Sequence, residues 1–368
     1  MREVYPSNFF RAELLKAIKY PEISYRKFCQ EEYMGLDRKQ NREFMGLPLH
    51  KKIMIHHTQL SQFRASMAFP QMTNLLVYVL SHFFQSGMLS QGVLHGVDST
   101  ELPNDNMRPL CSLNVNGQKI RIYTDIDADC GKRRNKRDKS SFFIGYRMHT
   151  LTVIDAQTGH SFPLVSLLAA GNHHDSLFLK PLIKLAQAMG IEVKLITADE
   201  AYHDKDGSIF DETGVRLITP PSSQSELPDN VCPETLAVTC DDLCHIPMIY
   251  MGCVEGGHEF KCGAEPGQCS RAVCSQCRIV PLDNGHFQRI PMLCEYASEA
   301  IEIRKNSERP FNLLKHREGL EQVRVRSQHS LMARCTFSNI ATLLLEMAGT
   351  RKKKIKDNSQ GELFDIAA

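Results

Sequence analysis

The spacing of hydrophobic residues predicts a mostly helical structure for residues 1–92. Apolar side chains recur at helical spacing through 10–18, and Ser24 is a residue type that caps a following helix. The run 75–84 is apolar enough for a buried helix. We therefore expect a helical N-terminal domain. DNA binding and a plain scaffolding role are both open for it.

From Val93 onward the pattern changes to short apolar runs that are typical of β-strands. The first run ends in Asp98 and two hydroxyl residues, which predicts a buried strand with a turn directly after Asp98. Further runs of this kind predict an antiparallel meander; they cover 120–123, 142–154 and 162–168.

Beyond the meander, helix and strand signals alternate. Ser176 is expected to cap a helix over Leu177–Met189, which Gly190 would end. The apolar run 192–197 then leads to Asp199. Antiparallel strands followed by alternating helix and strand indicate a mixed α/β sheet.

The later part of the chain changes composition twice. The stretch 219–225 is rich in Pro and Ser and predicts a linker, and nine of the 13 cysteines lie in Cys232–Cys294. We predict a helical N-terminal domain expected to bind DNA (1–92), the first part of a sheet domain (93–220), a cysteine-rich insertion (221–294), the helical end of the sheet domain (295–348) and a disordered basic tail (349–368).

The net charge of +2 gives no sign of a strongly basic nucleic-acid binder, so the distribution of charge matters more than its sum. Lys and Arg cluster at 132–137 and 351–354, where solvated loops and phosphate contacts are both reasonable interpretations. The most apolar run, 75–84, is too short to span a bilayer, and the N-terminus has no apolar signal region. We expect a cytoplasmic protein without a membrane partner, whose cysteines do not form structural disulfides.

Three carboxylates stand out because of where they fall in this pattern. Asp98 and Asp199 follow predicted apolar strands, and Glu308 lies in a polar, predicted helical segment. Carboxylates that converge from separate elements provide the oxygen ligands that Mg²⁺ or Mn²⁺ takes. Two such ions can promote a phosphodiester displacement. The alternative is that each carboxylate caps a helix or pairs at the surface, since the chain has 42 acidic residues.

Glu308 has cationic neighbours at helical spacing. Arg304 precedes it by four residues and Lys315 follows it by seven, which places all three on one helix face. Such a face could bind metal and phosphate together, or could be a stripe of salt bridges. Pro310 means that the helix either starts near Ser307 or bends.

Taken together, the motifs resemble bacterial insertion-sequence transposases of the DDE class, in the group with a tyrosine-arginine-glutamate-lysine signature. The matching segments run in the family's order: 96–100, 125–128, 143–149, 171–176, 198–202, and Arg304 with Glu308 and Lys315. The signature's tyrosine position is Ile301 here, so a DNA contact by that tyrosine is lost or moved.

The resemblance implies an RNase H-like mixed sheet flanked by helices, with metal-dependent DNA cleavage and strand transfer. It assigns catalysis and two Mg²⁺ or Mn²⁺ ions to Asp98, Asp199 and Glu308, and DNA contacts to Arg304, Lys315 and Arg147. It also implies terminal inverted repeats and target DNA as partners, a homodimer in the DNA complex, and a bacterial cytoplasmic, nucleoid-associated location. Two alternatives stay open: a nuclease or resolvase of the same fold without strand transfer, and an inactive DNA-binding derivative.

The cysteine-rich insertion is a candidate zinc site. Cys274 and Cys277 form a CxxC pair, and two ligands from Cys253, Cys262 and Cys269 would complete a tetrahedral set. Our preferred ligand set is Cys262, Cys269, Cys274 and Cys277. A zinc site is expected here because a structural zinc ion can hold together an insertion too small for its own core. Free thiols in a loop-rich insertion are the alternative.

Overall fold

The computed structural model describes most of the chain up to residue 219 and separate parts of the remainder. The described residues are 4–87, 89, 94–104, 109–134, 140–154, 161–202, 204, 208–219, 238–239, 246–255, 257–265, 268, 277–281, 300, 302–305, 308, 311, 320 and 327–348. The predictions for the tail 349–368 and for most of the linker lie outside these residues.

The helical prediction for the N-terminal part is confirmed. Its helices are α1 (Pro6–Lys19), α2 (Tyr25–Phe28), α3 (Glu31–Met34), α4 (Lys39–Met45), α5 (His57–Ser66) and α6 (Phe69–Gln85). Ser24 caps α2 as predicted, because its hydroxyl accepts the Lys27 N–H at 3.2 Å. The first five helices enclose a small core of their own that includes Leu15, Phe28 and Leu60.

Two buried polar groups hold these short helices together. The Arg42 guanidinium is fully buried and donates to four backbone carbonyls; the acceptors are those of Met34, Pro48, Lys51 and Ile53. Glu13 accepts hydrogen bonds from Arg64 at 2.5 Å and from the Tyr25 hydroxyl at 2.6 Å. The Arg42 bonds fix the chain around α4, whereas the bond between Glu13 and Arg64 links α1 to α5 across 51 positions of sequence.

The central element is a mixed sheet, so the mixed α/β prediction is confirmed. Its strands are β1 (Leu94–Pro103), β4 (Asp129–Arg134), β5 (Ser140–Ile154), β6 (Ser161–Ala170), β7 (Leu195–Thr197) and β8 (Arg216–Ile218). The order is β4-β5-β1-β7-β8, and β6 also pairs with β5. β1 runs antiparallel to β5 and parallel to β7, and β7 runs parallel to β8.

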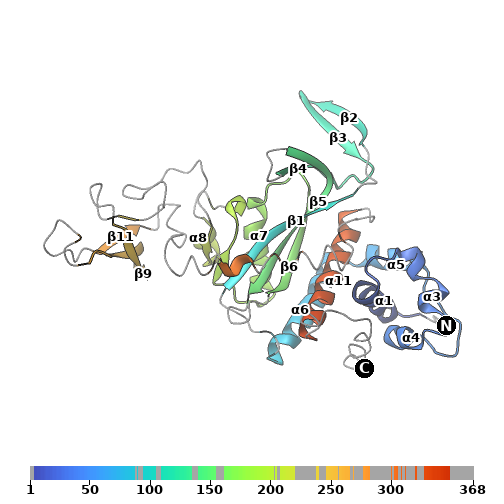
Figure 1. Ribbon diagram of the computed structural model, residues 1–368. Coiled ribbons are helices and arrows are strands. Elements are labelled where there is room, and N and C mark those ends of the chain that lie inside the picture. Colours follow the sequence, from blue (N-terminus) through green and yellow to red (C-terminus); the bar gives the residue numbers. More distant parts are fainter. Residues whose placement is uncertain are drawn as a thin grey trace.

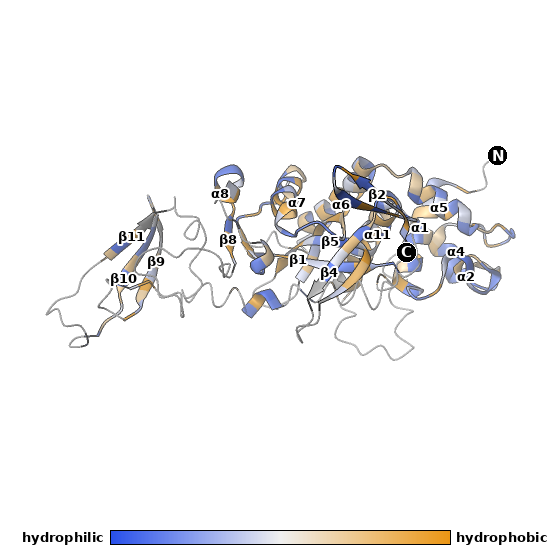
Figure 2. Ribbon diagram, turned by 90° about the horizontal axis from the view of Figure 1, so that it is seen from above, coloured by the Kyte–Doolittle hydropathy of each residue, from blue (hydrophilic) through white to orange (hydrophobic). Residues whose placement is uncertain are grey.

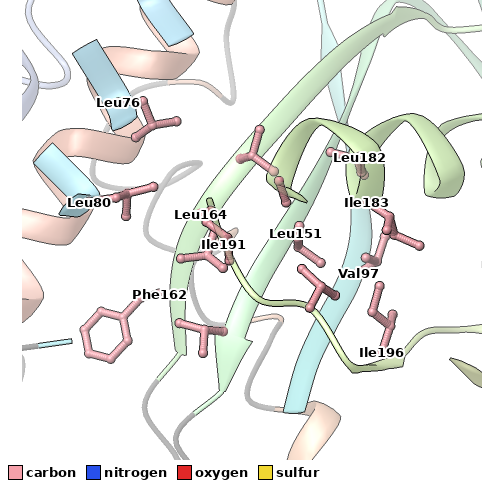
Figure 3. Close-up of a cluster of buried hydrophobic side chains, with 14 of the residues drawn as sticks. Leu76, Leu80, Val97, Leu151, Phe162, Leu164, Leu182, Ile183, Ile191 and Ile196 are labelled. Atoms are coloured by element: carbon pink, nitrogen blue, oxygen red, sulfur yellow. The ribbon is translucent and has the colours of Figure 1, made fainter. Parts of the chain in front are cut away.

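Helices cover both faces of this sheet (Figure 1). On one face α7 (Ser176–Ala188) packs Leu182 and Ile183 toward Val97 of β1 and Leu151 of β5 (Figure 3). On the other face α11 (Gln328–Met347) packs against β6, and its Leu331 and Cys335 share a hydrophobic cluster with Leu168 of β6 and Met148 of β5. α6 lies beside α11 and joins the N-terminal helices to the sheet.

Three strand predictions were wrong in detail. β1 does not end at Asp98: it continues to Pro103, because the long strand β5 pairs with it as far as Gly145. The expected strand at 120–123 is part of β3 (Gln118–Tyr123), which pairs with β2 (Pro109–Val115) in a separate hairpin. The strand expected over the apolar run 192–197 is shorter than predicted, because β7 covers only Leu195–Thr197.

The cysteine-rich insertion contains a small antiparallel sheet. Its strands are β9 (Met248–Val254), β10 (Gly257–Cys262) and β11 (Cys277–Pro281), in the order β11-β10-β9. The N-terminal helices and this small sheet lie at opposite ends of the molecule, with the central sheet between them (Figures 1 and 2). Among the described helices, none combines the length and hydrophobicity needed to cross a membrane.

Candidate functional site

The candidate site begins where the parallel pairing of β1 with β7 ends. Gly96 of β1 lies opposite Thr197 of β7, and this is the last pair of the register. Asp98 and Asp199 each follow two residues later. Neighbouring parallel strands thus bring the two carboxylates to the same end of the sheet.

The carboxyl group of Asp98 lies in a strongly perturbed environment. Burial raises the pKa of Asp98 to about 7, and the negative charges of Asp199 and Glu308 act in the same direction. The Ser99 N–H, which donates to Asp98 at 2.8 Å, and the positive charge of Arg304 oppose this increase in the pKa. Residues from three separate parts of the chain therefore interact electrostatically with Asp98.

Asp199 has a related environment. Burial raises its pKa, and the charge of Asp175 raises it further, whereas Arg304 and the backbone N–H of Ala201 lower it. The Ala201 N–H lies 3.1 Å from the Asp199 carboxylate. Asp199 is followed at once by a short 3₁₀ helix, η1 (Glu200–Tyr202), which fixes the direction of the chain beyond it.

Arg304 and Glu308 belong to helical backbone, with Arg304 half-buried and Glu308 exposed. Lys315, Ile301 and Pro310 lie outside the described residues. Both described residues act on Asp98, with opposite signs. The common helix face for Arg304, Glu308 and Lys315 stays a prediction.

A second group of polar side chains lies on the α7 face of the sheet. The Asp175 carboxylate accepts hydrogen bonds from Arg147 at 2.8 Å and from the Ser99 hydroxyl at 3.1 Å. Asp175 is the N-cap residue of α7 but makes no side-chain capping bond, so the expected cap at Ser176 was wrong by one position. The carboxylate is used to bind β1 and β5 instead.

His149 and Tyr202 form the inner part of this second group. The His149 Nδ1 lies 2.9 Å from the Tyr202 hydroxyl, and its ring stacks on Phe178 of α7 with centroids 4.3 Å apart. Burial lowers the pKa of His149 to about 4, against the opposing effect of Asp175. The imidazole is therefore neutral at physiological pH.

Sequence reasoning named Arg147 from this group but gave no role to Asp175, His149 or Tyr202. A signal was present, since all three lie within the motif segments 143–149, 171–176 and 198–202. Arg147 was expected to contact DNA. Its guanidinium bonds Asp175, lies 3.9 Å from Glu101, and belongs to a side chain that is 15% exposed.

The chemistry of Asp98, Asp199 and Glu308 fits a hard divalent cation, because their ligand atoms are carboxylate oxygens and the negative charges of Asp199 and Glu308 raise the pKa of Asp98. A cation of charge +2 among them would relieve this repulsion. Within the described part of the chain, no three histidine, cysteine, aspartate or glutamate side chains are arranged to share a metal ion as they stand.

In the insertion, strand register restricts the choice of cysteine ligands. Cys277 of β11 lies opposite Lys261, so its backbone is next to that of Cys262 at the end of β10. Because side chains alternate along a strand, the register directs Cys277 and Cys262 to opposite faces of this sheet. Cys253 lies opposite His258, which is four residues before Cys262 on β10. The backbone of Cys253 is therefore about 13 Å from that of Cys262, at ~3.3 Å per residue. Zinc–sulfur bonds of about 2.3 Å exclude Cys253 from a site that contains Cys262 and Cys277. Cys269 and Cys274 lie outside the described residues.

Comparison with known proteins gives little help. No family model matches the chain, and no curated protein sequence matches it. Among solved structures, the chain is similar to a piggyBac transposase in a synaptic complex with hairpin DNA, at 10% sequence identity and a TM-score of 0.38. That likeness covers 98% of this chain and 69% of the other.

Proposed function

We propose that the chain is a DNA transposase of an insertion sequence, which cleaves and joins phosphodiester bonds with divalent metal ions. The observation that carries the proposal is the raised pKa of Asp98, to which Asp199 and Glu308 both contribute. Asp199 and Glu308, from two other segments of the chain, thus act on Asp98 just beyond the β1–β7 pairing. Acidic groups whose pKa is shifted by burial and by neighbouring charges cluster at functional sites.

The topology of the sheet supports an RNase H-like catalytic domain. Numbered in chain order, β1, β5, β6, β7 and β8 lie in the order 3-2-1-4-5, with antiparallel pairs first and parallel pairs last. Asp98 lies on the central strand and Asp199 follows its parallel neighbour. This arrangement is the one expected for the first two acidic residues of the family that the sequence resembles.

The proposed roles divide the residues into two sets. Asp98, Asp199 and Glu308 would hold two Mg²⁺ or Mn²⁺ ions, which when bound supply activation of the attacking oxygen and stabilisation of the leaving oxygen. Arg304 and Lys315 would bind backbone phosphates and orient the DNA. A water molecule, and then the freed 3′-hydroxyl, would attack phosphodiester bonds in line.

The partners follow from this reaction. Terminal inverted repeats and target DNA would both bind at the part of the surface that carries Arg304, with Arg147 as a further contact. Since two element ends must be held together, we propose a homodimer in the DNA complex and a nucleoid-associated protein in the cytoplasm.

A strand-transfer assay tests the proposal. With Mg²⁺ or Mn²⁺ and DNA that carries the element's own terminal repeats, the wild type should cut the ends and join them to target DNA. Asp98→Asn, Asp199→Asn and Glu308→Gln should each abolish both steps, while Glu192→Gln, which changes an exposed carboxylate paired with Lys194, should retain them. Cleavage that survives Asp199→Asn would overturn the assignment.

The products separate the two alternatives. Cut ends that are never joined to target DNA would identify a nuclease or resolvase. DNA binding without metal-dependent cleavage, unaffected by loss of all three carboxylates, would identify an inactive DNA-binding derivative.

For the insertion we propose a structural zinc ion bound by Cys262, Cys269, Cys274 and Cys277. The support is the CxxC spacing of Cys274 and Cys277. Purified protein should contain about one zinc per chain. Cys277→Ser should lose it, whereas Cys111→Ser, a change at an exposed free thiol on β2, should not. Full zinc content in Cys277→Ser would contradict this ligand set.

A further inference from the structure

The second group of polar side chains, a buried polar cluster on the α7 face of the sheet, lies beside the segments that carry Asp98 and Asp199. Asp175 is 8% exposed, Tyr202 1% and His149 0%, so the cluster is almost closed to solvent. Buried polar groups at such positions are costly unless they are fully bonded, and once bonded they hold their segments rigidly. Each member of the cluster contacts a segment that carries a proposed metal ligand or the strand beside it.

We propose that Asp175 and Tyr202 are positioning residues that set the spacing of Asp98 and Asp199. Asp175 would act through Ser99, and Tyr202 would act through His149. The proposal rests on the proposed function, because it concerns the same pair of carboxylates.

The first link runs from α7 to Asp98. Ser99 directly follows Asp98, and its N–H donates to the Asp98 carboxylate at 2.8 Å. The hydroxyl of the same residue donates to Asp175 at 3.1 Å, across 76 positions of sequence. The orientation of the Ser99 peptide, and with it the Asp98 carboxylate, is therefore fixed from the N-terminus of α7.

The second link runs from β5 to Asp199. Tyr202 belongs to the turn that follows Asp199, and its N–H donates to the Asp199 carbonyl at 3.1 Å. Its hydroxyl lies 2.9 Å from the His149 Nδ1. The turn that carries Asp199 is thereby tied to β5.

Both links meet at one position of the sheet. Ser99 of β1 and His149 of β5 are opposite each other in the register. Asp98 and Asp199 belong to segments about 100 positions apart, yet the orientation of both depends on this single pair and on Phe178, which stacks on His149.

A carboxylate at position 175 has a cost, because its negative charge raises the pKa of Asp199. Its hydrogen bonds explain why a carboxylate suits this position. Both oxygens of Asp175 are used: Oδ1 accepts from Arg147 and Oδ2 accepts from Ser99. An asparagine could accept only one of these bonds with its single oxygen. The Arg147 cation at 2.8 Å offsets the like charge, so Arg147 has a structural role whether or not it contacts DNA.

The test measures Mn²⁺ binding to metal-free protein by electron paramagnetic resonance, which needs neither DNA nor turnover. Asp175→Asn, Ser99→Ala and Tyr202→Phe should each weaken Mn²⁺ binding about tenfold, the range found for groups that orient metal ligands. Ser99→Thr keeps a hydroxyl and should restore affinity close to the wild-type value. In strand transfer, Ser99→Ala should need about tenfold more metal for half-maximal rate, with DNA affinity unchanged.

A matched control separates positioning from general stability. Glu212→Gln removes the charge and one of the two acceptor oxygens that bind Lys180 and Lys184 between α7 and α8 (Ser208–Thr213), and it should leave Mn²⁺ affinity unchanged. If Asp175→Asn does not fold, as judged by circular dichroism, the Ser99→Ala and Ser99→Thr pair decides the question.

The outcomes distinguish this inference from the proposed function. Mn²⁺ binding that is lost in Asp199→Asn but unchanged in Ser99→Ala and Tyr202→Phe would overturn the inference alone. Wild-type protein that binds no Mn²⁺, or binds it equally well without Asp199, would overturn the proposed metal site as well.

Discussion

Asp98 on β1 and Asp199 after β7 occupy equivalent positions relative to the parallel pairing of these strands, each two residues beyond its last pair, Gly96 with Thr197. Burial and the charge of Asp199 both raise the pKa of Asp98, to about 7. The two carboxylates are therefore held together against their mutual repulsion. This arrangement stores a destabilising interaction at the place where a cation would remove it.

Replacement of Asp98 should therefore stabilise the metal-free protein. The folded-state pKa of Asp98 is raised, so its favourable contribution is complete below the unfolded value near 3.8 and is lost as the pH rises through about 7. Asp98→Asn keeps an acceptor for the Ser99 N–H and removes the charge. At pH 8 in EDTA it should raise the free energy of unfolding by on the order of 1–3 kcal/mol.

Thermal unfolding followed by circular dichroism between pH 4 and 8.5 measures this effect. The gain of Asp98→Asn over the wild type should disappear toward pH 4, and Mn²⁺ should stabilise only the wild type. Glu192→Gln serves as the control for loss of an exposed charge. A lower melting temperature for Asp98→Asn at pH 8 would contradict the electrostatic account.

His149 should behave in the opposite way with pH. Its folded-state pKa is lowered to about 4, so its contribution to stability is present above the unfolded pKa near 6.5 and is lost as the pH falls through about 4. Because the ring is fully buried, its NMR resonance should keep the shift of neutral imidazole down to about pH 5. His149→Gln assigns that resonance and should flatten the loss of stability in acid. A His149 resonance that titrates between pH 6 and 7 would be incompatible with this environment.

Much of the fold could be predicted because its periodicity is local. α1, α6 and α7 show helical spacing, and β5 and β6 are long and apolar. The full length of β1 was hidden, since Ser99, Thr100 and Glu101 have the composition of a turn and only pairing with β5 extends the strand. β4 was missed for a similar reason: its sequence from Asp129 is polar and basic, and its edge pairing with β5 supplies the hydrogen bonds.

The candidate site divides in the same way. Asp98 and Asp199 could be selected because each follows an apolar run, and strand ends gather at one edge of a sheet. The contacts behind them could not, because Ser99 with Asp175 and His149 with Tyr202 are separated by 76 and 53 positions. No local pattern encodes such distances, although each residue lies in a segment that the family resemblance had marked.

The buried ion pair between Glu13 and Arg64 should be important for the N-terminal helices. Its side chains are 1% and 5% exposed, and Arg64 also lies over the Tyr25 ring. Glu13→Ala would leave the Arg64 charge buried without its partner and should lower the free energy of unfolding by roughly 3–5 kcal/mol. Urea unfolding followed by circular dichroism measures this change.

The exposed pair of Lys52 with Glu31 provides the comparison, with side chains 70% and 65% exposed. Lys52→Ala should leave the midpoint of urea unfolding close to that of the wild type, because exposed ion pairs contribute little. Equal effects for Glu13→Ala and Lys52→Ala would show that burial of the Glu13–Arg64 pair has no special role.

Gly145 sets how closely β5 approaches β1, and through this the position of the whole site. A Cβ at this position would lie 2.3 Å from the Leu102 carbonyl oxygen of β1, and the φ angle of +155° is one that other residues rarely adopt. The atoms nearest to this Cβ all belong to the backbone of β1 and cannot turn aside as a flexible side chain would, so Gly145→Ala must shift one strand relative to the other. We expect a loss of more than about 3 kcal/mol in the free energy of unfolding.

Gly190→Ala is the control, because its φ of +80° is also strained but nothing lies within 4 Å of the added Cβ, and it should cost only about 1 kcal/mol. Since Arg147 and His149 follow Gly145 on β5, the shift should weaken Mn²⁺ binding in Gly145→Ala and leave it intact in Gly190→Ala. Equal stability of the two variants in urea would mean that β5 can move away from β1 without cost, and the register of the site would then not depend on Gly145.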